Sequence, residues 1–310
     1  NGKVSGIRRK LMKNKISIAI FALIGIFLFT GCGKEVKQSS ASNSAGKSAA
    51  AFAQLERDYS AKLGVYALDT QTNKEVMYRA DERFLYCSTS KALLVGIVLQ
   101  QNSPAQLKQV VKYSQDDILS YAPVTREHVE QGMTLEEICI AALHFSDNTA
   151  ANLLFNHIGG PTGFKSALNK LGDNITEPVR LEPHLNEVIP GDNSDTSTPR
   201  QLAIDLQAYT TGNILTEDKR KMLIDWMAGN VTGKQMIRAG APADWLVADK
   251  SGSGSYGTRN DIAIVMPPNR KPIIIAIVST HAEKEAKYDD QLIAQPAKIV
   301  FDSLAVQTVK

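Results

Sequence analysis

The sequence predicts a mixed fold of helices and strands (α+β or α/β), in which a five-stranded antiparallel sheet is flanked by helices from both ends of the chain. Two strand patterns lie near the amino terminus, three follow Gly229, and the segment between them is mostly helical. A sheet built from the two ends of a chain leaves the middle as an inserted, all-helical domain. We expect a functional site in the seam between the two domains.

Apolar residues bounded by turn residues mark the strands. The first two strands are joined by the turn Gln71-Thr72-Asn73, and the last two by Pro267-Pro268-Asn269-Arg270. The predicted strands span residues 63–69, 75–78, 245–249, 261–266 and 272–280. The sheet domain would comprise residues 49–81 and 230–310, and the helical domain residues 82–229.

Apolar residues at helical spacing and local start and stop signals indicate the helices. Thr134-Leu135-Glu136-Glu137 has the form of a capping box, and Thr198-Pro199 places proline after a capping residue. Other helices are predicted to begin near Ala49, Ser88, Thr149, Thr162, Thr216 and Tyr288. We expect Pro296 to kink the last of them. Asn174 to Thr196 has no periodicity, and a loop of this length within a compact domain is usually functional.

The amino terminus has the features of an export signal. Met12 opens a basic stretch, Ile16 to Phe29 is mostly apolar, and Phe29-Thr30-Gly31-Cys32 resembles a bacterial lipoprotein cleavage box. The apolar run is shorter than the roughly 20 residues that span a bilayer. We predict a signal peptide at 1–31 with Met12 as its natural start, lipid attachment at Cys32, and a flexible tether at 32–48. Cleavage without lipidation, which would give a soluble secreted protein, is the alternative.

Charge and composition exclude several classes of function. The net charge of +3 arises in the first 31 residues, which hold six basic and no acidic residues, so the rest of the chain is slightly acidic. It therefore contains no basic domain for nucleic acid. The five histidines form no metal-binding pattern, and no phosphate-binding glycine motif occurs, so we expect neither a metal nor another cofactor. Three cysteines are too few for a disulfide framework.

Ser88 and Lys91 are the first candidate catalytic pair. They lie three residues apart at the start of an apolar helix, a spacing that brings side chains together on one face. A serine needs a neighbouring proton acceptor to act as a nucleophile, and a helix amino terminus favours developing negative charge. The pattern is weak alone, because Ser44-Ala45-Gly46-Lys47 repeats it. The alternative is a helix cap beside a solvated lysine.

Three further patterns follow Ser88 along the chain. They are S-D-N at 146–148, E-x-x-L-N from Glu182 to Asn186 in the long loop, and K-S-G at 250–252, at the end of a predicted strand. Each is common by itself as a cap, a solvated loop or a turn. The ordered set S-x-x-K, S-D-N, E-x-x-L-N and K-[ST]-G, from about Ala49 to the carboxyl terminus, resembles the class A serine β-lactamases.

This resemblance implies hydrolysis of the β-lactam amide of penicillins and cephalosporins through an acyl-enzyme, which gives antibiotic resistance. Ser88 would be acylated, Lys91 would hold the proton network around it, and Ser146 would pass a proton to the leaving nitrogen. Glu182 and Asn186 would hold and deprotonate the water that hydrolyses the ester. Whether the lysine or the glutamate is the acylation base is disputed for this family.

Other implied residues bind substrate or support the site. The oxyanion hole would use the backbone N–H groups of Ser88 and Ser253. Substrate binding would fall to Tyr121, Asn148, Lys250, Ser251, Gly252 and Arg259. Among these, cations and a hydroxyl would bind the substrate carboxylate, Asn148 would hold its side-chain amide, and Tyr121 would form an aromatic wall, with simple packing as its alternative. Arg180 and Asp195 would pin the loop by an ion pair.

The resemblance also implies three further details of this chain. The Glu182-Pro183 bond would be cis, as in relatives. Val95 stands where some relatives have a cysteine that bonds to the position of Cys139, so that disulfide cannot form. Gly254 stands where some carbapenem-hydrolysing relatives have a cysteine that bonds to the position of Cys87, which argues against carbapenem hydrolysis.

Two other functions share part of the pattern. A D-Ala-D-Ala peptidase (penicillin-binding protein) and a non-catalytic β-lactam sensor both lack the deacylating glutamate, so Glu182 argues against them. We expect a monomer that binds β-lactam substrates and inhibitors and is held by lipid on Cys32 at the outer face of the bacterial cell membrane, with a released soluble form as a variant. The preference between penicillins and cephalosporins depends on the pocket shape at the level of one or two kcal/mol.

Overall fold

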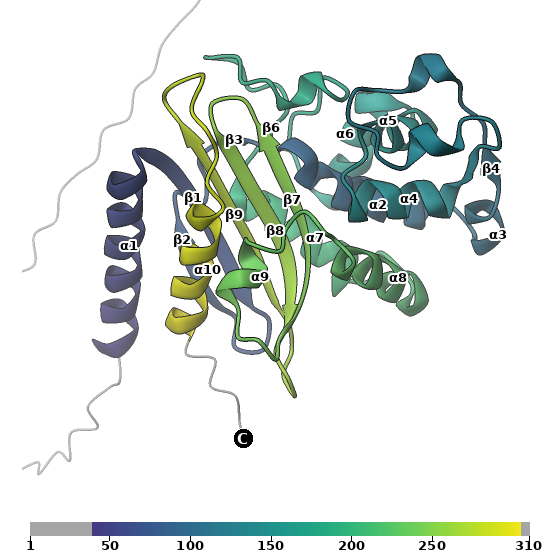
Figure 1. Ribbon diagram of the computed structural model, residues 1–310. Helices are drawn as coiled ribbons and strands as arrows, with labels where there is room; N and C mark the ends of the chain where they lie inside the picture. Colours follow the sequence, from purple (N-terminus) through teal and green to yellow (C-terminus); the bar gives the residue numbers. More distant parts are fainter. Residues whose placement is uncertain (1–38, 305–310) are drawn as a thin grey trace, which may run out of the picture. The chain divides into compact units, whose positions relative to one another are not determined.

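A five-stranded antiparallel sheet with the strand order β2-β1-β9-β8-β7 forms the centre of the structure (Figure 1). Its strands are β1 (Ala61–Asp69), β2 (Lys74–Tyr78), β7 (Leu246–Gly254), β8 (Thr258–Met266) and β9 (Ile273–His281). Strand β1 pairs with β9, with Val65 opposite Ile277, so the two ends of the folded chain meet in one sheet. The predicted sheet is confirmed. The computed structural model describes residues 39–304, and the predicted signal peptide, Met12 and Cys32 lie outside them.

Ten α-helices, four short 3₁₀ helices and two short strand pairs complete the structure within residues 39–304. The α-helices are α1 (Ser39–Tyr59), α2 (Ser90–Gln101), α3 (Pro104–Leu107), α4 (Leu135–His144), α5 (Asn148–His157), α6 (Gly160–Leu171), α7 (Pro199–Thr210), α8 (Glu217–Ala228), α9 (Ile237–Gly240) and α10 (Gln291–Leu304). The short strands β3 (Phe84–Leu85) and β6 (Thr196–Ser197) pair with each other, as do β4 (Val110–Val111) and β5 (Met133–Thr134). None of these helices is both long and apolar enough to cross a membrane.

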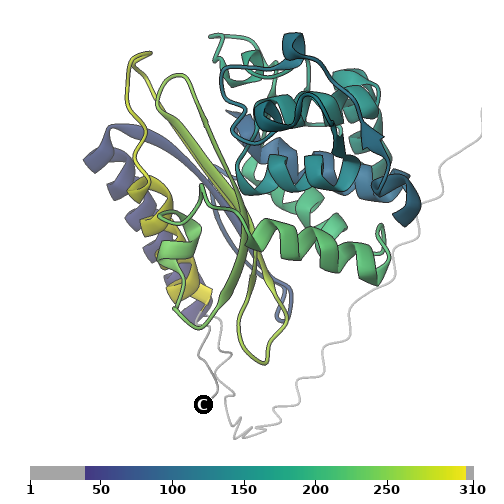
Figure 2. The same ribbon diagram turned by 45° about the vertical axis from the view of Figure 1, so that its right-hand side comes forward.

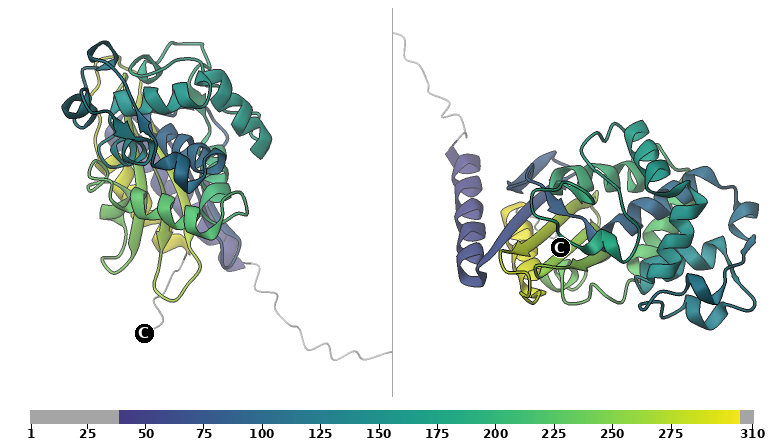
Figure 3. Two further views of the ribbon diagram at one scale, coloured as in Figure 1. Left: turned by 90° about the vertical axis from the view of Figure 1, so that its right-hand side faces the viewer. Right: turned by 90° about the horizontal axis from the view of Figure 1, so that it is seen from above.

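The sheet separates two hydrophobic cores. Helices α1, α9 and α10 cover one face, and the helical segment that includes α2, α4, α5, α7 and α8 lies on the other (Figures 2 and 3). Alternate residues of β9 serve the two cores: Ile275 and Ile277 pack toward the terminal helices, and Ala276 and Val278 toward the helical segment. Because strand side chains alternate between faces, a nearly continuous apolar strand is expected where both faces are covered. The domain boundaries predicted at 81/82 and 229/230 stay a prediction.

Several helix signals are confirmed. Thr134 and Glu137 form both hydrogen bonds of a capping box before α4. Thr198 accepts a hydrogen bond from the backbone N–H of Gln201 and is followed by Pro199 at the start of α7. Helix α10 begins at Gln291, later than expected, and continues through the buried Pro296. The kink at Pro296 stays a prediction.

The predicted tether is wrong for residues 39–48, because α1 already begins at Ser39. The richness in Ser, Ala and Gly favoured a linker. Alanine nevertheless has the highest helix propensity, and the segment contains several alanines before Phe52. Phe52 and Leu55 are buried against the sheet, and packing of this kind stabilises a helix more than local propensity does.

The hairpin of β7 and β8 is longer than predicted. Strand β7 continues through Lys250-Ser251-Gly252 to Gly254, so the K-S-G motif lies inside a strand and not at its end. In the connecting turn, Tyr256 and Gly257 have φ angles of 58° and 55°. Positive φ at successive turn residues suits a tight hairpin, and this turn lets both strands extend beyond the apolar residues that predicted them.

Candidate active site

Ser88 lies in a single 3₁₀ turn, Cys87–Thr89, immediately before α2, and not in the helix itself as predicted. The side-chain amide of Asn260 on β8 donates to the carbonyl of Leu85 at 2.6 Å and so fixes the entry to this turn. Strand β7 lies against the turn at Gly252, where a Cβ atom would come within 3.0 Å of Cys87 Cβ and 3.2 Å of the Ser88 nitrogen. Glycine at 252 therefore permits this close approach.

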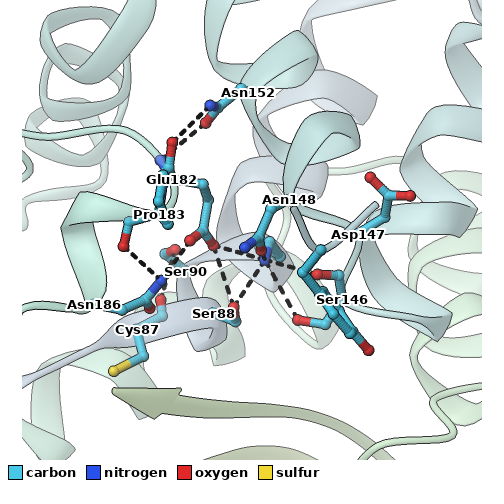
Figure 4. A network of polar contacts seen from close by, with 12 residues as sticks. Cys87, Ser88, Ser90, Ser146, Asp147, Asn148, Asn152, Glu182, Pro183 and Asn186 are labelled. Carbon is cyan, nitrogen blue, oxygen red and sulfur yellow. Dashed lines mark hydrogen bonds and ion pairs between the residues drawn. The ribbon is translucent and has the colours of Figure 1, made fainter. Parts of the chain in front are cut away.

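Lys91 lies one turn beyond Ser88 and is fully buried. Figure 4 shows the polar network around Ser88, to which Ser146, Asn148 and Glu182 belong. Lys91 Nζ donates to Ser88 Oγ at 2.8 Å and to Asn148 Oδ1 at 2.8 Å, and lies 2.7 Å from Glu182 Oε1. Nζ also donates to the carbonyl oxygen of Ser146 at 3.1 Å. The network thus joins three of the sequence motifs around one hydroxyl.

Glu182 faces Ser88 from the loop between α6 and β6. Ser88 Oγ donates to Glu182 Oε1 at 3.2 Å, and Asn186 Nδ2 donates to Glu182 Oε2 at 2.5 Å. The Glu182-Pro183 bond is cis, as expected. Asn152 on α5 holds the glutamate backbone through two hydrogen bonds, at 2.9 and 3.0 Å. Sequence reasoning missed Asn152, because no motif marks a side chain that binds only backbone.

Asp195 fixes the same loop. Its carboxylate pairs with Arg180 Nε at 2.5 Å, as predicted, and accepts from the backbone N–H groups of Val179 and Arg180. Tyr86 OH donates to Asp195 Oδ1 at 2.9 Å. Tyr86 directly precedes the turn that carries Ser88, so one buried carboxylate connects the loop of Glu182 to the segment of Ser88. The role of Tyr86 was not predicted.

Lys250 approaches from the opposite side of the site. Its Nζ donates to Ser146 Oγ at 3.2 Å and to the carbonyl of Ser251 at 2.8 Å. Burial, followed by repulsion from Lys91, lowers the pKa of Lys250 to about 7. A lysine with such a pKa can exchange a proton near neutral pH. Ser146 lies between the two lysines, where it can accept a proton from one side and pass it to a ligand.

A pocket of about 410 Å³ opens in front of Ser88. It is lined by Ser88, Tyr121, Ser146, Asn148, Asn186, Thr232, Ser251, Gly252, Ser253, Arg259 and Tyr288. The predicted residues Ser146, Asn148, Ser253 and Arg259 are therefore brought together, although they come from distant parts of the chain. Tyr121 is 50% exposed, and its hydroxyl donates to the Phe145 carbonyl; a purely packing role does not account for that exposure.

The end of the pocket near Arg259 contains partners that no motif predicted. Arg259 Nε lies 2.7 Å from Asp290 Oδ1, and the guanidinium carbon lies 4.4 Å from the ring centre of Tyr288. The hydroxyls of Ser251 and Thr232 are 2.6 Å apart. These contacts orient a cation and a hydroxyl toward the same space, as binding of an anionic group requires. Single residues such as Asp290 and Thr232 carry no local sequence signal.

Cys87 and Cys139 are buried and free, in agreement with the expected absence of either disulfide. Burial raises the pKa of both thiols, so both stay protonated. The second S-x-x-K copy, Ser44 to Lys47, lies in α1 on the face of the sheet away from α2. It takes no part in this site.

Comparison with known proteins agrees with this geometry. A model of the Beta-lactamase enzyme family matches residues 47–304. A β-lactamase of Bacillus subtilis is 54% identical over 253 residues, which cover 82% of this chain and 83% of the relative, and Beta-lactamase 3 of Bacillus cereus is 52% identical over 256 residues, which cover 83% and 81%. The crystal structure of a class A β-lactamase from Clostridium kluyveri is 72% identical, with a TM-score of 0.83 over 84% of this chain and 99% of that one. The chain therefore belongs to the class A serine β-lactamases, enzymes that hydrolyse β-lactams.

Proposed function

We propose that this enzyme hydrolyses penicillins and cephalosporins by acylation of Ser88 and deacylation through Glu182. The observation that carries the proposal is the position of two groups at one hydroxyl: Lys91 Nζ lies 2.8 Å and Glu182 Oε1 3.2 Å from Ser88 Oγ. A serine with a proton acceptor at this distance can attack a carbonyl. A carboxylate that stays beside the resulting ester can activate water, which a D-Ala-D-Ala peptidase or a sensor does not need.

In the acylation step, Ser88 Oγ forms a bond to the lactam carbonyl carbon and its proton passes to Lys91 or Glu182. The backbone N–H groups of Ser88 and Ser253 stabilise the oxyanion, and a donor of this kind typically contributes about 3–4 kcal/mol. As the carbon–nitrogen bond breaks, Ser146 delivers a proton to the nitrogen. Its hydroxyl lies 3.2 Å from Lys250 Nζ and 3.4 Å from Lys91 Nζ, so a proton from either lysine can replace the one it gives up.

In the deacylation step, Glu182 removes a proton from a water that attacks the ester. Asn186 Nδ2 holds Glu182 Oε2, and its second role is to orient that water. Arg259, Ser251 and Lys250 bind the substrate carboxylate, while Asn148 holds the side-chain amide and Tyr121 forms one wall. Asp290 holds Nε of Arg259 and leaves the terminal nitrogens of the guanidinium for the carboxylate.

Purified enzyme is expected to open many molecules of benzylpenicillin per active site. Lys91 and Glu182 together allow both halves of the cycle, so the reaction should continue after a first turnover. Loss of the lactam absorbance at saturating substrate, with the active sites counted by mass spectrometry, measures the number of turnovers. A burst of one product molecule per site and no further reaction would instead indicate a peptidase-like protein that acylates only.

We further propose that the protein is exported, acts as a monomer, and is anchored by lipid on Cys32 at the outer face of the bacterial cell membrane. The basic start, the apolar run and the lipoprotein-like box before Cys32 support this proposal. A single acyl chain gives only marginal binding, and two lipid signals anchor a protein stably. An anchored enzyme would meet β-lactams before they reach the cell-wall enzymes.

Cys32→Ser is expected to move most of the β-lactamase activity from the membrane pellet to the medium of a bacterial host. The matched control is Cys139→Ser, which changes a buried cysteine far from the amino terminus and should leave the activity with the membranes. Mass spectrometry of the amino-terminal peptide checks the lipid directly. Activity of Cys32→Ser that still sediments with membranes would refute the anchor.

A further inference from the structure

Two buried carboxyl groups meet where the loop of Glu182 begins. Asp173 follows the end of α6, and Asp205 lies in the second turn of α7; each is only 1% exposed. In each carboxyl the oxygen Oδ2 is buried and has no hydrogen-bond partner in the described part of the chain, and the charge of Asp173 acts on Asp205. The other oxygen of each group is engaged: Asp173 Oδ1 accepts from the N–H groups of Ile175 and Thr176, and Asp205 Oδ1 accepts from Gln201 Nε2 at 2.9 Å.

The placement of these two carboxyls favours a shared proton. Among residues 39–304, no donor hydrogen meets Oδ2 of Asp173 or Oδ2 of Asp205, and both atoms are buried. A buried oxygen without a donor is costly, and two adjacent buried negative charges are more so. A hydrogen bond between two carboxyls exists only when one of them is protonated. One proton held between Asp173 and Asp205 resolves both problems.

This pair lies at the base of the loop, where its two ends are joined. Thr176 Oγ1 and Ser197 Oγ are 2.7 Å apart, and the N–H of Glu177 donates to the carbonyl of Thr196 at 3.0 Å. Asp173 fixes the first of these two segments through its bonds to the backbone N–H groups of Ile175 and Thr176. Any change that moves Asp173 therefore also moves the joined ends of the loop, and this loop carries Glu182.

We propose that Asp205 is a positioning residue for deacylation: it shares one proton with Asp173, and loss of that proton loosens the loop base and displaces Glu182 from its productive position. The inference rests on the role proposed above for Glu182. Acylation has a second candidate proton acceptor in Lys91, which Asp205 does not position, so we expect it to change less.

The electrostatic surroundings set the pH at which the proton leaves. Burial, followed by the charge of Asp173, raises the pKa of Asp205 to about 9. Besides Asp173, the titratable group that Asp205 affects is Tyr209, one turn further along α7, whose pKa is raised mainly by burial. No cation among residues 39–304 contributes to the pKa of Asp205. The pair is thus protonated at neutral pH and ionises in the alkaline range.

Asp205→Asn is the test, because asparagine donates a hydrogen bond to Asp173 Oδ2 at every pH. Decay of the benzylpenicilloyl-enzyme, followed by quench-flow mass spectrometry, should match the parent within about twofold at pH 7. A group with a pKa of about 9 keeps its proton in roughly a tenth of the molecules at pH 10, so the variant should then deacylate about tenfold faster than the parent. The value of kcat/KM reports acylation. Its ratio between Asp205→Asn and the parent should stay nearly constant from pH 7 to pH 10.

The proposal would be overturned if the deacylation rate of Asp205→Asn, divided by that of the parent, were the same at pH 7 and pH 10. Titration of Lys250 is common to both proteins and cancels when the variant is compared with the parent. Asp192→Asn, an exposed aspartate of the same loop, is the matched control and should give a flat ratio. If Asp205→Asn does not fold, Asp173→Asn supplies the same permanent donor from the other side. The Glu182 assignment has its own test in Glu182→Ala at a single pH, so the two can fail separately.

Discussion

Glu182→Ala is expected to form the penicilloyl ester on Ser88 and then to hydrolyse it about 10²–10⁴-fold more slowly than the parent, the range that a positioned general base supplies. Glu182 Oε1 is the carboxylate oxygen that contacts Ser88 Oγ, and its partner oxygen is held by Asn186. Removing the carboxyl leaves the ester facing a lysine, a serine and two amides, none of which can take a proton from water as readily. Mass spectrometry should show the adduct at full occupancy once acylation is complete.

The same variant decides which residue is the acylation base. Lys91 Nζ is nearer to Ser88 Oγ than Glu182 is, at 2.8 Å against 3.2 Å. If Lys91 is the base, the burst of Glu182→Ala keeps the parent rate; if Glu182 is the base, the burst slows as well. Glu187→Ala, an exposed glutamate of the same loop, is the control and should deacylate normally. Steady turnover by Glu182→Ala at the parent rate would contradict our assignment.

Much of the fold could be predicted because its signals are local. Capping residues and prolines marked the starts of α4 and α7, and apolar strands bounded by turns marked the sheet. The errors occurred where a local signal was outweighed by other forces. A Ser- and Ala-rich stretch became the first half of α1, and the polar residues of Lys250-Ser251-Gly252 continue β7 because they pair with β8 and not because they are apolar.

The residues of the candidate site also fall into two groups: those that lie in a local sequence motif and those that do not. Ser88, Lys91, Glu182 and Asn148 lie in short motifs whose order identifies a family, so their sequence was sufficient to find them. Asn152, Asp195 and Asp290 act on other residues across the fold through hydrogen bonds and ion pairs. Asp195 was found only through the resemblance. Such partners depend on three-dimensional proximity, which a single sequence does not encode at any fixed spacing.

Lys91→Met is expected to slow acylation of Ser88 by at least about 10²-fold, so the acyl-enzyme should form correspondingly more slowly. Methionine has a similar length but cannot donate to Ser88 Oγ, Asn148 Oδ1 or Glu182 Oε1. Stopped-flow measurement of benzylpenicillin opening gives the acylation rate. Acylation at the parent rate would show that Lys91 does not manage the proton of Ser88.

The double variant Lys91→Met with Glu182→Gln separates chemistry from stability. Lys91 and Glu182 form an ion pair at 2.7 Å with both side chains fully buried, and removal of one partner from such a pair typically costs about 3–5 kcal/mol. Urea unfolding should therefore show Lys91→Met to be strongly destabilised, and the second substitution should recover part of the loss because no unpaired charge remains. Activity should not recover, since neither proton acceptor is present.

Lys108→Met is the control: its pair with Glu136 is solvent-exposed on the lysine side, and such pairs are worth about 0–1 kcal/mol. Recovery of turnover together with stability would mean that Lys91 acts on the fold alone.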